Sequence, residues 1–438
     1  MSEPDSLRKR CVLVRFEWVV AVLAAPFLIF PSVRPALTAT ALVLLAAVWL
    51  ARWALRGEAW PVTPFNGALL LFAVMIPVGI WASALPEETL PKAAGLVLGL
   101  AVFRAVGLTV RTRREVGLAS AAFCLVGVGI SAAGALSVNW SAKVAALGAV
   151  TGRIPRLLEG LPSMPAGGVN PNQLAGTLAL YLPVAAALAW WAIREGLLVK
   201  LAGLVFLALV GGVLVLTQSR SGWMGGAAGV LALAALAGLT GQGRRGRLVG
   251  GVVILVALVA LVAVVVAVGP QELGGVLYGN ESVDAVESVV GSISLAGRLE
   301  IWSRALYAIQ DFAFTGCGLG TFRRVVHILY PLFLISPGTD IAHAHNMFLQ
   351  TAVDLGLPGL VAYLALLLVG LAVCWKVAAE GGGLRRAAAL GLAAGMVGFH
   401  VYGLTDAVAL GSKPGVAFWF TLGLMAALAG DGTQINTD

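Results

Sequence analysis

Charged residues are scarce in this sequence. Only 11% of its 438 residues are Asp, Glu, Lys or Arg, and 59% are hydrophobic, whereas soluble proteins carry roughly 25% charged residues. Windows of about 20 apolar residues recur along the chain, which is the length that crosses a bilayer as a helix. The scarcity of charge therefore excludes an ordinary soluble domain and predicts an all-α, polytopic membrane protein.

Other absences from the sequence exclude further classes of protein and of site. The four cysteines are scattered, so they predict neither a disulfide framework nor a metal site. No cleavable signal peptide is evident, because Arg8, Lys9 and Arg10 precede an apolar span without a cleavage site. No internal repeat is visible, although repeated halves are typical of transporters. The net charge of +8 does not imply nucleic acid, since basic residues of membrane proteins gather in cytoplasmic loops.

About twelve transmembrane helices are expected from the apolar windows. They cover residues 17–33, 36–54, 64–82, 91–110, 116–136, 173–193, 197–217, 222–239, 248–268, 347–378, 387–405 and 414–430. The tenth window is too long for one straight crossing, so we expect Gly356-Leu-Pro358-Gly359 to separate an interfacial turn from the true span. Most basic residues fall in alternate connections, and the positive-inside rule then places both termini in the cytoplasm.

Two connections on the outer side are long, and they define the domain plan. Residues 1–268 hold helices one to nine with an outer loop at 137–172. Residues 269–346 form a second outer loop, and residues 347–438 hold the last three helices and a short tail. Loops this long are usually functional. Apolar residues recur at helical spacing from Leu299 to Ile309 and from Phe322 to Leu329, which predicts two amphipathic helices joined by a turn at Thr315–Gly320.

Three of the four histidines lie in the second outer loop, and two of them form His343-Ala-His345 after Asp340. An extended H-x-H would point both rings to one side, where Asp340 could complete a metal triad. A histidine can also act as a general base without any metal, and nearby arginines favour its neutral form. A structural role is the third alternative. Asn346 is expected to cap the helix that re-enters the bilayer.

Several arginines stand at the membrane boundary. Arg220 lies in a tight outer turn between two apolar spans, where it either extends to the interface or binds an anion such as a phosphate. Arg298 begins the first loop helix, one turn before Trp302. Arg153 and Arg156 of the first outer loop can add positive charge to a phosphate site or face lipid headgroups.

Two further polar positions, at the ends of expected spans, can be interpreted from their location alone. Asn170-Pro-Asn172 opens the sixth span, as a helix cap or as a ligand contact. Arg104 lies near the cytoplasmic end of the fourth span, so it is expected to extend its head to the interface.

Taken in order, these motifs resemble the signature of the bacterial O-antigen ligase and O-antigen polymerase superfamily. The resemblance rests on Thr217-Gln-Ser-Arg-Ser-Gly222, Gly297-Arg298 with Trp302, Thr315-Gly-Cys-Gly-Leu-Gly-Thr-Phe322, His345-Asn346 and Asp354-Leu-Gly-Leu-Pro-Gly359. It extends from about Asn170 to Gly359. Asp354 departs from the Glu that is frequent before Leu-Gly-x-Pro-Gly.

The resemblance implies a metal-independent, inverting glycosyltransferase of the bacterial inner membrane whose active site faces the periplasm. Such enzymes move a glycan from undecaprenyl diphosphate to an acceptor, and they use no cofactor. The catalytic residues would be His345, Arg298 and Arg220. The substrate-binding residues would be Arg153, Arg156, His343, Asn346, Trp302 and Asn172.

The acceptor stays open at this point. An O-antigen ligase uses lipid A–core, in lipopolysaccharide biosynthesis; a polymerase uses another lipid-linked repeat unit; and a protein O-oligosaccharyltransferase uses a side-chain hydroxyl. The ligase is the favoured reading. A transporter of lipid or glycan is the alternative outside enzymes, and the one-sided polar cluster argues against it.

Overall fold

The computed structural model describes residues 3–57, 60–110, 112–138, 140, 144–158, 169–241, 243–268, 295–336 and 338–430. These residues are almost entirely α-helical, which confirms the all-α fold class. Each of the twelve expected spans coincides with a helix. These helices are α1 (Glu3–Ile29), α2 (Pro35–Arg56), α3 (Asn66–Ala82), α4 (Pro86–Thr109), α5 (Arg113–Ala135), α7 (Pro171–Ala192), α8 (Leu197–Leu216), α9 (Arg220–Leu239), α10 (Arg244–Val268), α14 (Met347–Glu380), α15 (Gly383–Gly403) and α16 (Val416–Leu428).

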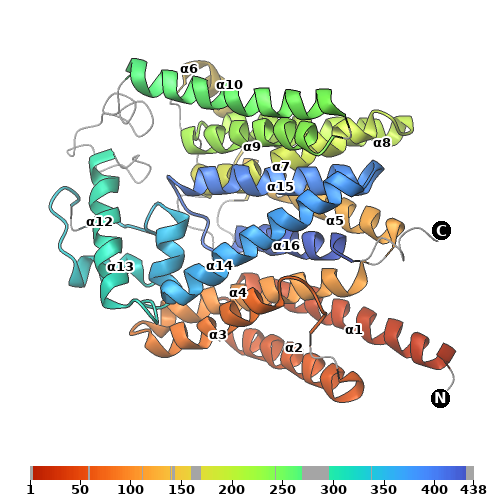
Figure 1. Ribbon diagram of the computed structural model, residues 1–438. Coiled ribbons are helices and arrows are strands. Elements are labelled where there is room, and N and C mark those ends of the chain that lie inside the picture. The colour runs from red at the N-terminus through yellow and green to blue at the C-terminus, as the bar shows by residue number, and fades with distance from the viewer. Residues whose placement is uncertain are drawn as a thin grey trace.

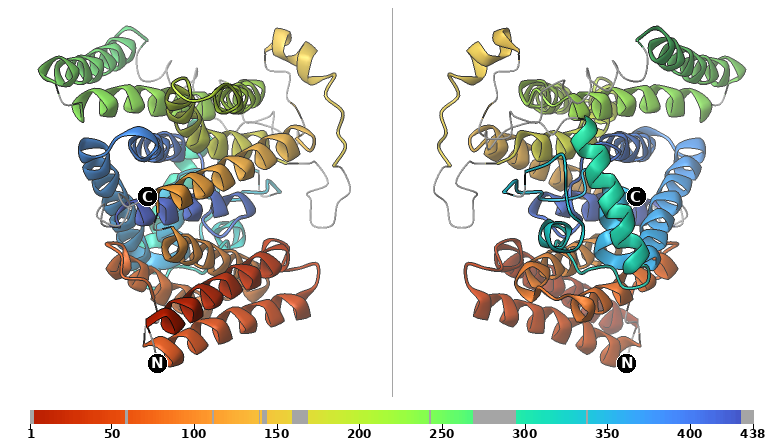
Figure 2. Two further views of the ribbon diagram at one scale, coloured as in Figure 1. Left: turned by 90° about the vertical axis from the view of Figure 1, so that its right-hand side faces the viewer. Right: turned by 90° about the vertical axis from the view of Figure 1, so that its left-hand side faces the viewer.

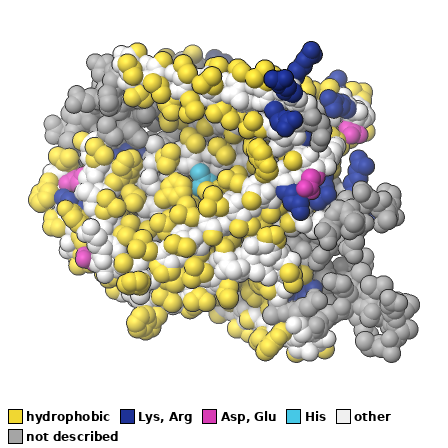
Figure 3. Space-filling view, viewed as in Figure 1, with side chains coloured by type: hydrophobic (Ala, Val, Ile, Leu, Met, Phe, Trp, Pro, Cys, Tyr) yellow, Lys and Arg dark blue, Asp and Glu magenta, His cyan; other side chains and the backbone are white. Residues whose placement is uncertain are grey.

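The long helices run side by side as one bundle (Figure 1). Eight of them have the length and mean hydropathy that a membrane crossing requires, and three shorter apolar helices accompany them. The beginning of α1 and the end of α16 lie at the same end of the bundle. Most of the Lys and Arg side chains visible in Figure 3 lie toward that end too. The chain is therefore a polytopic membrane protein in which basic side chains are concentrated at one end of the helix bundle.

The helix α4 begins earlier than its apolar window suggested. Its first residue is Pro86 rather than residue 91, and Glu87 and Glu88 occupy its first turn. Proline is favoured at the first helical position because its missing N–H would have no partner there. Acidic side chains in the first turn are stabilised by the helix dipole. Hydropathy does not take account of proline at the first position or of acidic residues in the first turn, so the apolar window began too late.

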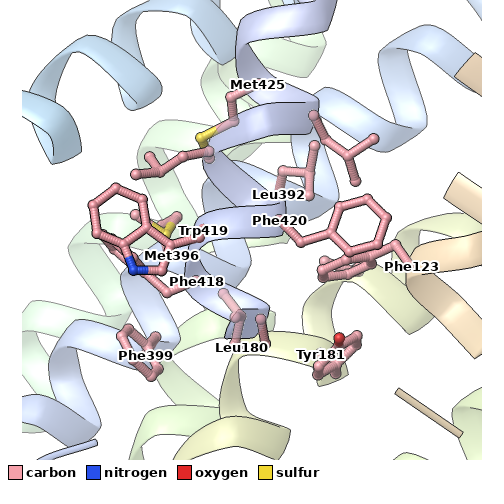
Figure 4. Close-up of a cluster of buried hydrophobic side chains, with 14 of the residues drawn as sticks. Phe123, Leu180, Tyr181, Leu392, Met396, Phe399, Phe418, Trp419, Phe420 and Met425 are labelled. Carbon is pink, nitrogen blue, oxygen red and sulfur yellow. The ribbon is translucent and has the colours of Figure 1, made fainter. Parts of the chain in front are cut away.

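The centre of the bundle is α15, which is buried along most of its length among α7, α9 and α14. Large side chains fill the space beside it (Figure 4). Phe123 of α5 stacks on Tyr181 of α7 with ring centroids 4.4 Å apart, and Phe420 of α16 meets Phe123 edge to face. Close packing of this kind holds membrane helices together, because lipid offers little hydrophobic drive between them.

The two helices expected in the second outer loop are confirmed as α12 (Leu295–Asp311) and α13 (Phe322–Leu329). In Figure 1, α12 lies across one end of the bundle, opposite the beginning of α1. Its apolar face joins α13 and the segment before α14 in a small core where Ile301, Phe322 and Ile341 are fully buried. The earlier part of that loop, 269–294, lies outside the described residues.

A break at Gly356 divides α14, as the sequence predicted. Gly356 has φ 69° and ψ 179°, so a short helix before it is separated from the long span after it. The Thr315–Gly320 turn packs into this break. The amide of Cys317 donates to the carbonyl of Val353 at 2.8 Å, and that of Leu357 donates to Ala313 at 2.7 Å. These bonds fasten the outer helices to the membrane bundle.

The expectation that Arg104 extends to the interface is wrong. Its side chain is fully buried and pairs with Glu17 of α1, which also contacts Arg52 of α2 at 3.5 Å. The guanidinium group lies 5.5 Å from the ring centroid of Trp49 and 5.1 Å from that of Trp60. A charge in a membrane protein is tolerated where a partner compensates it. Here the partner comes from a helix far away in the sequence.

The Gly316–Gly356 contact is expected to tolerate no side chain. A Cβ on Gly316 would lie 2.6 Å from the backbone of Asp354, and one on Gly356 would lie 2.8 Å from the backbone of Phe314. Both glycines also have positive φ, which costs an L-residue roughly 1–2 kcal/mol. We therefore expect Gly316→Ala and Gly356→Ala each to lower the thermal unfolding midpoint of the purified protein.

Gly129→Ala is the matched control, because a Cβ there has no atom within 4 Å. It should leave the midpoint unchanged or raise it, since alanine favours a helix by about 1 kcal/mol over glycine. Equal midpoints for Gly356→Ala and Gly129→Ala would show that the break in α14 needs no glycine.

Candidate active site

A buried carboxylate, Asp406, faces two histidines at the end of the bundle that α12 covers. Asp406 lies between α15 and α16, whereas His343 and His345 lie just before α14. Its Oδ1 atom is 3.3 Å from Nδ1 of His345 and 3.5 Å from Nε2 of His343. The same oxygen accepts the amide of Ala407 at 2.9 Å. The two imidazole centroids are 4.4 Å apart.

The hydrogen bonds distinguish the two histidines. Nδ1 of His343 accepts the backbone N–H of His345 at 3.2 Å, so the ring proton of His343 lies on Nε2, toward Asp406. In His345 it is Nδ1 that faces the carboxylate. A proton held there leaves Nε2 of His345 as the unprotonated nitrogen. His343 thus has both nitrogens engaged, while His345 keeps one as a proton acceptor.

The backbone at His345 is strained. Its φ is 47°, in the left-handed region that non-glycine residues rarely adopt. The extended H-x-H that the metal-site alternative assumed is therefore not what the backbone adopts, although the two rings do lie close together. Strain of this kind persists where surrounding contacts enforce it, and such contacts cluster at functional sites. The amide of Ala344 supplies one of them by donating to Oε1 of Gln350 at 2.7 Å.

Asp354 links the histidine segment to the glycine turn. Its Oδ1 accepts the amide of Gly320 at 2.9 Å and Nε2 of Gln350 at 2.8 Å. Since Gln350 in turn accepts from Ala344, a continuous chain of hydrogen bonds runs from the turn to Ala344, the residue before His345. The sequence placed Asp354 in a motif without giving it a task, and this chain supplies one.

Arg298 reaches the site from α12. Its side chain is buried, and it donates to the carbonyl of Thr405, the residue before Asp406. The guanidinium group therefore lies beside the carboxylate and the two histidines. Figure 2 (right) shows α12 running across this end of the molecule.

Arg220 reaches the same segment from α9. It is the first residue of α9 after the cap Ser219, and its side chain is exposed. The hydroxyl of its neighbour Ser221 accepts from that of Thr405 at 2.8 Å. Thr405 is therefore contacted by Arg298 of α12 and by Ser221, the residue next to Arg220. A helix N-terminus with a guanidinium group is suited to an anion, because its first amides point outward.

Trp302 and Asn346 hold the histidine segment in place. Nε1 of Trp302 donates to the carbonyl of His345 at 3.4 Å. Oδ1 of Asn346 caps α14 by accepting from Phe348 and Leu349, which confirms the expected cap, and Nδ2 donates to Leu404 at 3.0 Å. Their contacts are structural in this state, and substrate contact by either stays a prediction.

The remaining expected site residues are not brought to the histidines by the described contacts. Arg153 and Arg156 are exposed after α6 (Ala145–Thr151), which stands at the edge of the molecule in Figure 2. Asn172 donates its amide to the side chain of Asn170, so this motif caps α7. The first outer loop does approach the Arg220 turn at Val144, whose amide donates to Gln218 at 2.7 Å.

Asp340 is not the carboxylate of the histidine cluster. It is exposed and forms an ion pair with Arg323. Asp406 takes its place, and the ligand atoms of His343, His345 and Asp406 all lie within 4.8 Å of one another. Asp406 is not among the residues predicted from the sequence, because it lies outside the long loop that holds the other polar residues. The signal was a carboxylate directly after an apolar span, where a charge usually has a function.

Burial sets the charge states at the site. Burial lowers the pKa of His343 to about 3, and His345 and Arg298 act in the same direction. Burial alone would raise the pKa of Asp406, but its hydrogen bond with His345 and the charges of His345, His343 and Arg298 hold it below its usual range. The site therefore contains a neutral His343 and an ionised Asp406 near neutral pH.

The fold and this site define a membrane protein with a polar, arginine-rich centre at one end of a helix bundle. Residues 202–364 match the family model described as O-antigen ligase. The match covers less than half of the chain; it supports a relation to the O-antigen ligase superfamily and indicates a membrane glycosyltransferase of the ligase or polymerase type. It includes Arg220, Arg298, His343 and His345, whereas Asp406 lies beyond it. No curated protein matches the chain.

Acid is expected to destabilise the protein partly through His343. Unfolded histidine has a pKa of about 6.5, and the folded pKa of His343 is about 3. Between these values the unfolded chain binds the extra proton, so stability falls as pH falls, by at most about 1.4 kcal/mol per pH unit. Thermal midpoints measured from pH 7 to pH 4 should decline less steeply in His343→Gln than in wild type.

His327→Gln is the control, because His327 lies on α13 outside the cluster. Its midpoints should follow those of wild type. If the curve of His343→Gln were also parallel to wild type, His343 would not be the buried neutral group inferred from the contacts.

Proposed function

We propose that this protein transfers a glycan from undecaprenyl diphosphate to a hydroxyl of lipid A–core, as an O-antigen ligase. The observation that carries the proposal is the placement of Arg298 and His345 around one carboxylate, Asp406. The site thereby combines a cation for a leaving diphosphate with a nitrogen for the proton of an attacking hydroxyl.

The arginines are proposed to hold the diphosphate of the donor. Arg298 is fixed through the carbonyl of Thr405, and Arg220 opens α9 next to Ser221, whose hydroxyl accepts from that of Thr405. As the glycosidic C–O bond breaks, negative charge develops on the leaving diphosphate. A guanidinium group that is buried and already held in place, as that of Arg298 is, stabilises such charge.

His345 is proposed as the general base. The acceptor oxygen attacks the anomeric carbon while Nε2 of His345 takes the proton of the hydroxyl, and undecaprenyl diphosphate leaves on the opposite face. A single displacement of this kind inverts the anomeric centre. Asp406 acts as a positioning residue, because a carboxylate at Nδ1 fixes the tautomer and stabilises the protonated ring.

The reaction is proposed to need no metal. Although His343, His345 and Asp406 could supply three ligand atoms, Oδ1 of Asp406 already accepts the amide of Ala407 and faces both imidazoles. Nδ1 of His343 likewise has a backbone partner. Two of the three ligand atoms therefore already have backbone partners, which supports a base in preference to a metal centre.

The site end of the bundle is proposed to face the periplasm, and both termini the cytoplasm. The charge distribution supports this orientation, since Lys and Arg gather toward the end opposite α12 (Figure 3). Lipid-linked glycans are then met on the outer leaflet of the bacterial inner membrane.

The purified protein, given lipid-linked glycan and lipid A–core, is expected to form the joined product, and to do so after exhaustive chelation with EDTA. Product analysis by mass spectrometry checks the acceptor. Elongated lipid-linked glycan would identify a polymerase, and a glycosylated protein an oligosaccharyltransferase. Loss of turnover in EDTA that one divalent ion restores would make the histidine cluster a metal site.

Replacing either proposed diphosphate-binding arginine by lysine is expected to impair transfer. Arg220→Lys and Arg298→Lys keep the charge but lose the planar fork that grips two phosphate oxygens. Losing a charge-assisted contact costs roughly 1.5–3 kcal/mol, so kcat/KM for the donor should fall about ten- to a hundredfold. Arg324→Lys on α13 is the control, because Arg324 is exposed. Normal kinetics in both site variants would make these arginines mere interfacial anchors.

His345→Ala is expected to bind donor normally but to lose turnover by roughly 10²–10⁴-fold, which is typical of removing a positioned base. Asp406→Asn should lower kcat less and also leave donor binding unchanged. Donor binding and single-turnover rates measured together check both. If His345→Ala lost donor binding while keeping its transfer rate at saturation, the residue would grip the diphosphate instead.

A further inference from the structure

A cationic pocket lies beside residues 411–413, in the same connection between α15 and α16 that carries Asp406. It has a volume of about 160 Å³ and is lined by the end of α1, the turn after it, α4 and residues 411–413. This is about ten times the 10–15 Å³ that one water requires. Two lysines, Lys92 of α4 and Lys413, border it. The pocket thus has the room and the charge for an anionic group.

Lys92 is the better buried of the two cations. Its stem lies along the glycine turn, because a Cβ on Gly320 would come within 3.2 Å of its Cγ. The negative charges of Asp354 and Glu88 favour its protonated form. Within the described residues, however, its ammonium group forms no ion pair within 4.0 Å. A partly buried ammonium without such a partner is costly. An anion in the adjoining pocket would supply the partner.

Lys413 approaches the pocket from the other side. Its Nζ lies 4.4 Å from the ring centroid of Phe30, in the turn after α1. The segment between Asp406 and Lys413 is held firmly against α4, since a Cβ on Gly411 would lie 2.2 Å from the carbonyl oxygen of Lys92. The segment from Asp406 to Lys413 therefore borders both the histidine cluster and this pocket.

We propose that this pocket binds a phosphate group of the acceptor lipid. The inference rests on the proposed function, in which two lipids must meet in one leaflet at the same end of the bundle. The donor diphosphate occupies Arg220 and Arg298, so a second phosphorylated lipid needs a cationic place of its own. Lysines suit this task, because a compact ammonium on a flexible stem binds phosphate as a point charge.

The test uses the full-length protein in nanodiscs of zwitterionic lipid, with the acceptor glycolipid in its phosphorylated and dephosphorylated forms. We expect Lys92→Gln with Lys413→Gln to weaken binding of the phosphorylated acceptor, measured without donor, by about tenfold or more. The KM for acceptor should rise equally, while kcat and the KM for donor stay unchanged. Removing the phosphates should weaken binding to wild type and abolish the difference between wild type and variant.

Lys376→Gln is the matched control, because this exposed lysine lies toward the other end of α14. If Lys92→Gln does not fold, Lys413→Gln alone should show a smaller shift of the same kind. Unchanged acceptor binding in the double variant overturns the proposal. So does an effect that appears only when anionic phospholipid is added to the nanodisc, since the pocket would then hold a bulk lipid headgroup.

The two proposals fail separately. A wild-type protein that binds phosphorylated acceptor through these lysines but transfers no glycan leaves the pocket in place and removes the proposed function. A protein that transfers glycan with an acceptor KM independent of both lysines does the opposite.

Discussion

The ionised carboxylate of Asp406 is the constraint on which the site depends. A charge buried at the end of a membrane bundle is costly unless donors surround it. Here Ala407 donates to it and both histidines before α14 contact it, while the positive charge of Arg298, held by the carbonyl of Thr405, lies nearby. Satisfying this one group therefore brings together the outer helices and the C-terminal third of the bundle.

A second buried carboxylate, that of Asp354, also joins distant segments through the groups that donate to it. By accepting from Gly320 and Gln350 it joins the glycine turn to the histidine segment. The break in α14 at Gly356 makes room for that turn, so the outer helices are fastened at two points. A strained residue such as His345 needs this degree of support, because each contact alone is weaker than the cost of holding the backbone in place.

Sequence reasoning predicted what depends on local pattern. Apolar windows located the twelve helices, helical spacing located α12 and α13, and Gly356-Leu-Pro358-Gly359 located the break in α14. Side-chain pairs between helices that are distant in the sequence could not be predicted in this way. Neither the burial of Arg104 against Glu17 nor the choice of Asp406 over Asp340 follows from local composition, because each depends on which distant segments become neighbours. The roles of the site residues stay proposals, while the fold brings His343, His345 and Arg298 together at the segment of Thr405 and Asp406.

The central claim is that the donor diphosphate lies between Arg220 and Arg298 with its anomeric carbon near His345. The most direct measurement is an electron cryomicroscopy structure of the protein in nanodiscs with a non-transferable donor analogue. The account predicts diphosphate density in contact with both guanidinium groups, and the first sugar facing Nε2 of His345. Density for the diphosphate at Lys92 and Lys413, with the arginines contacting only protein, would contradict it.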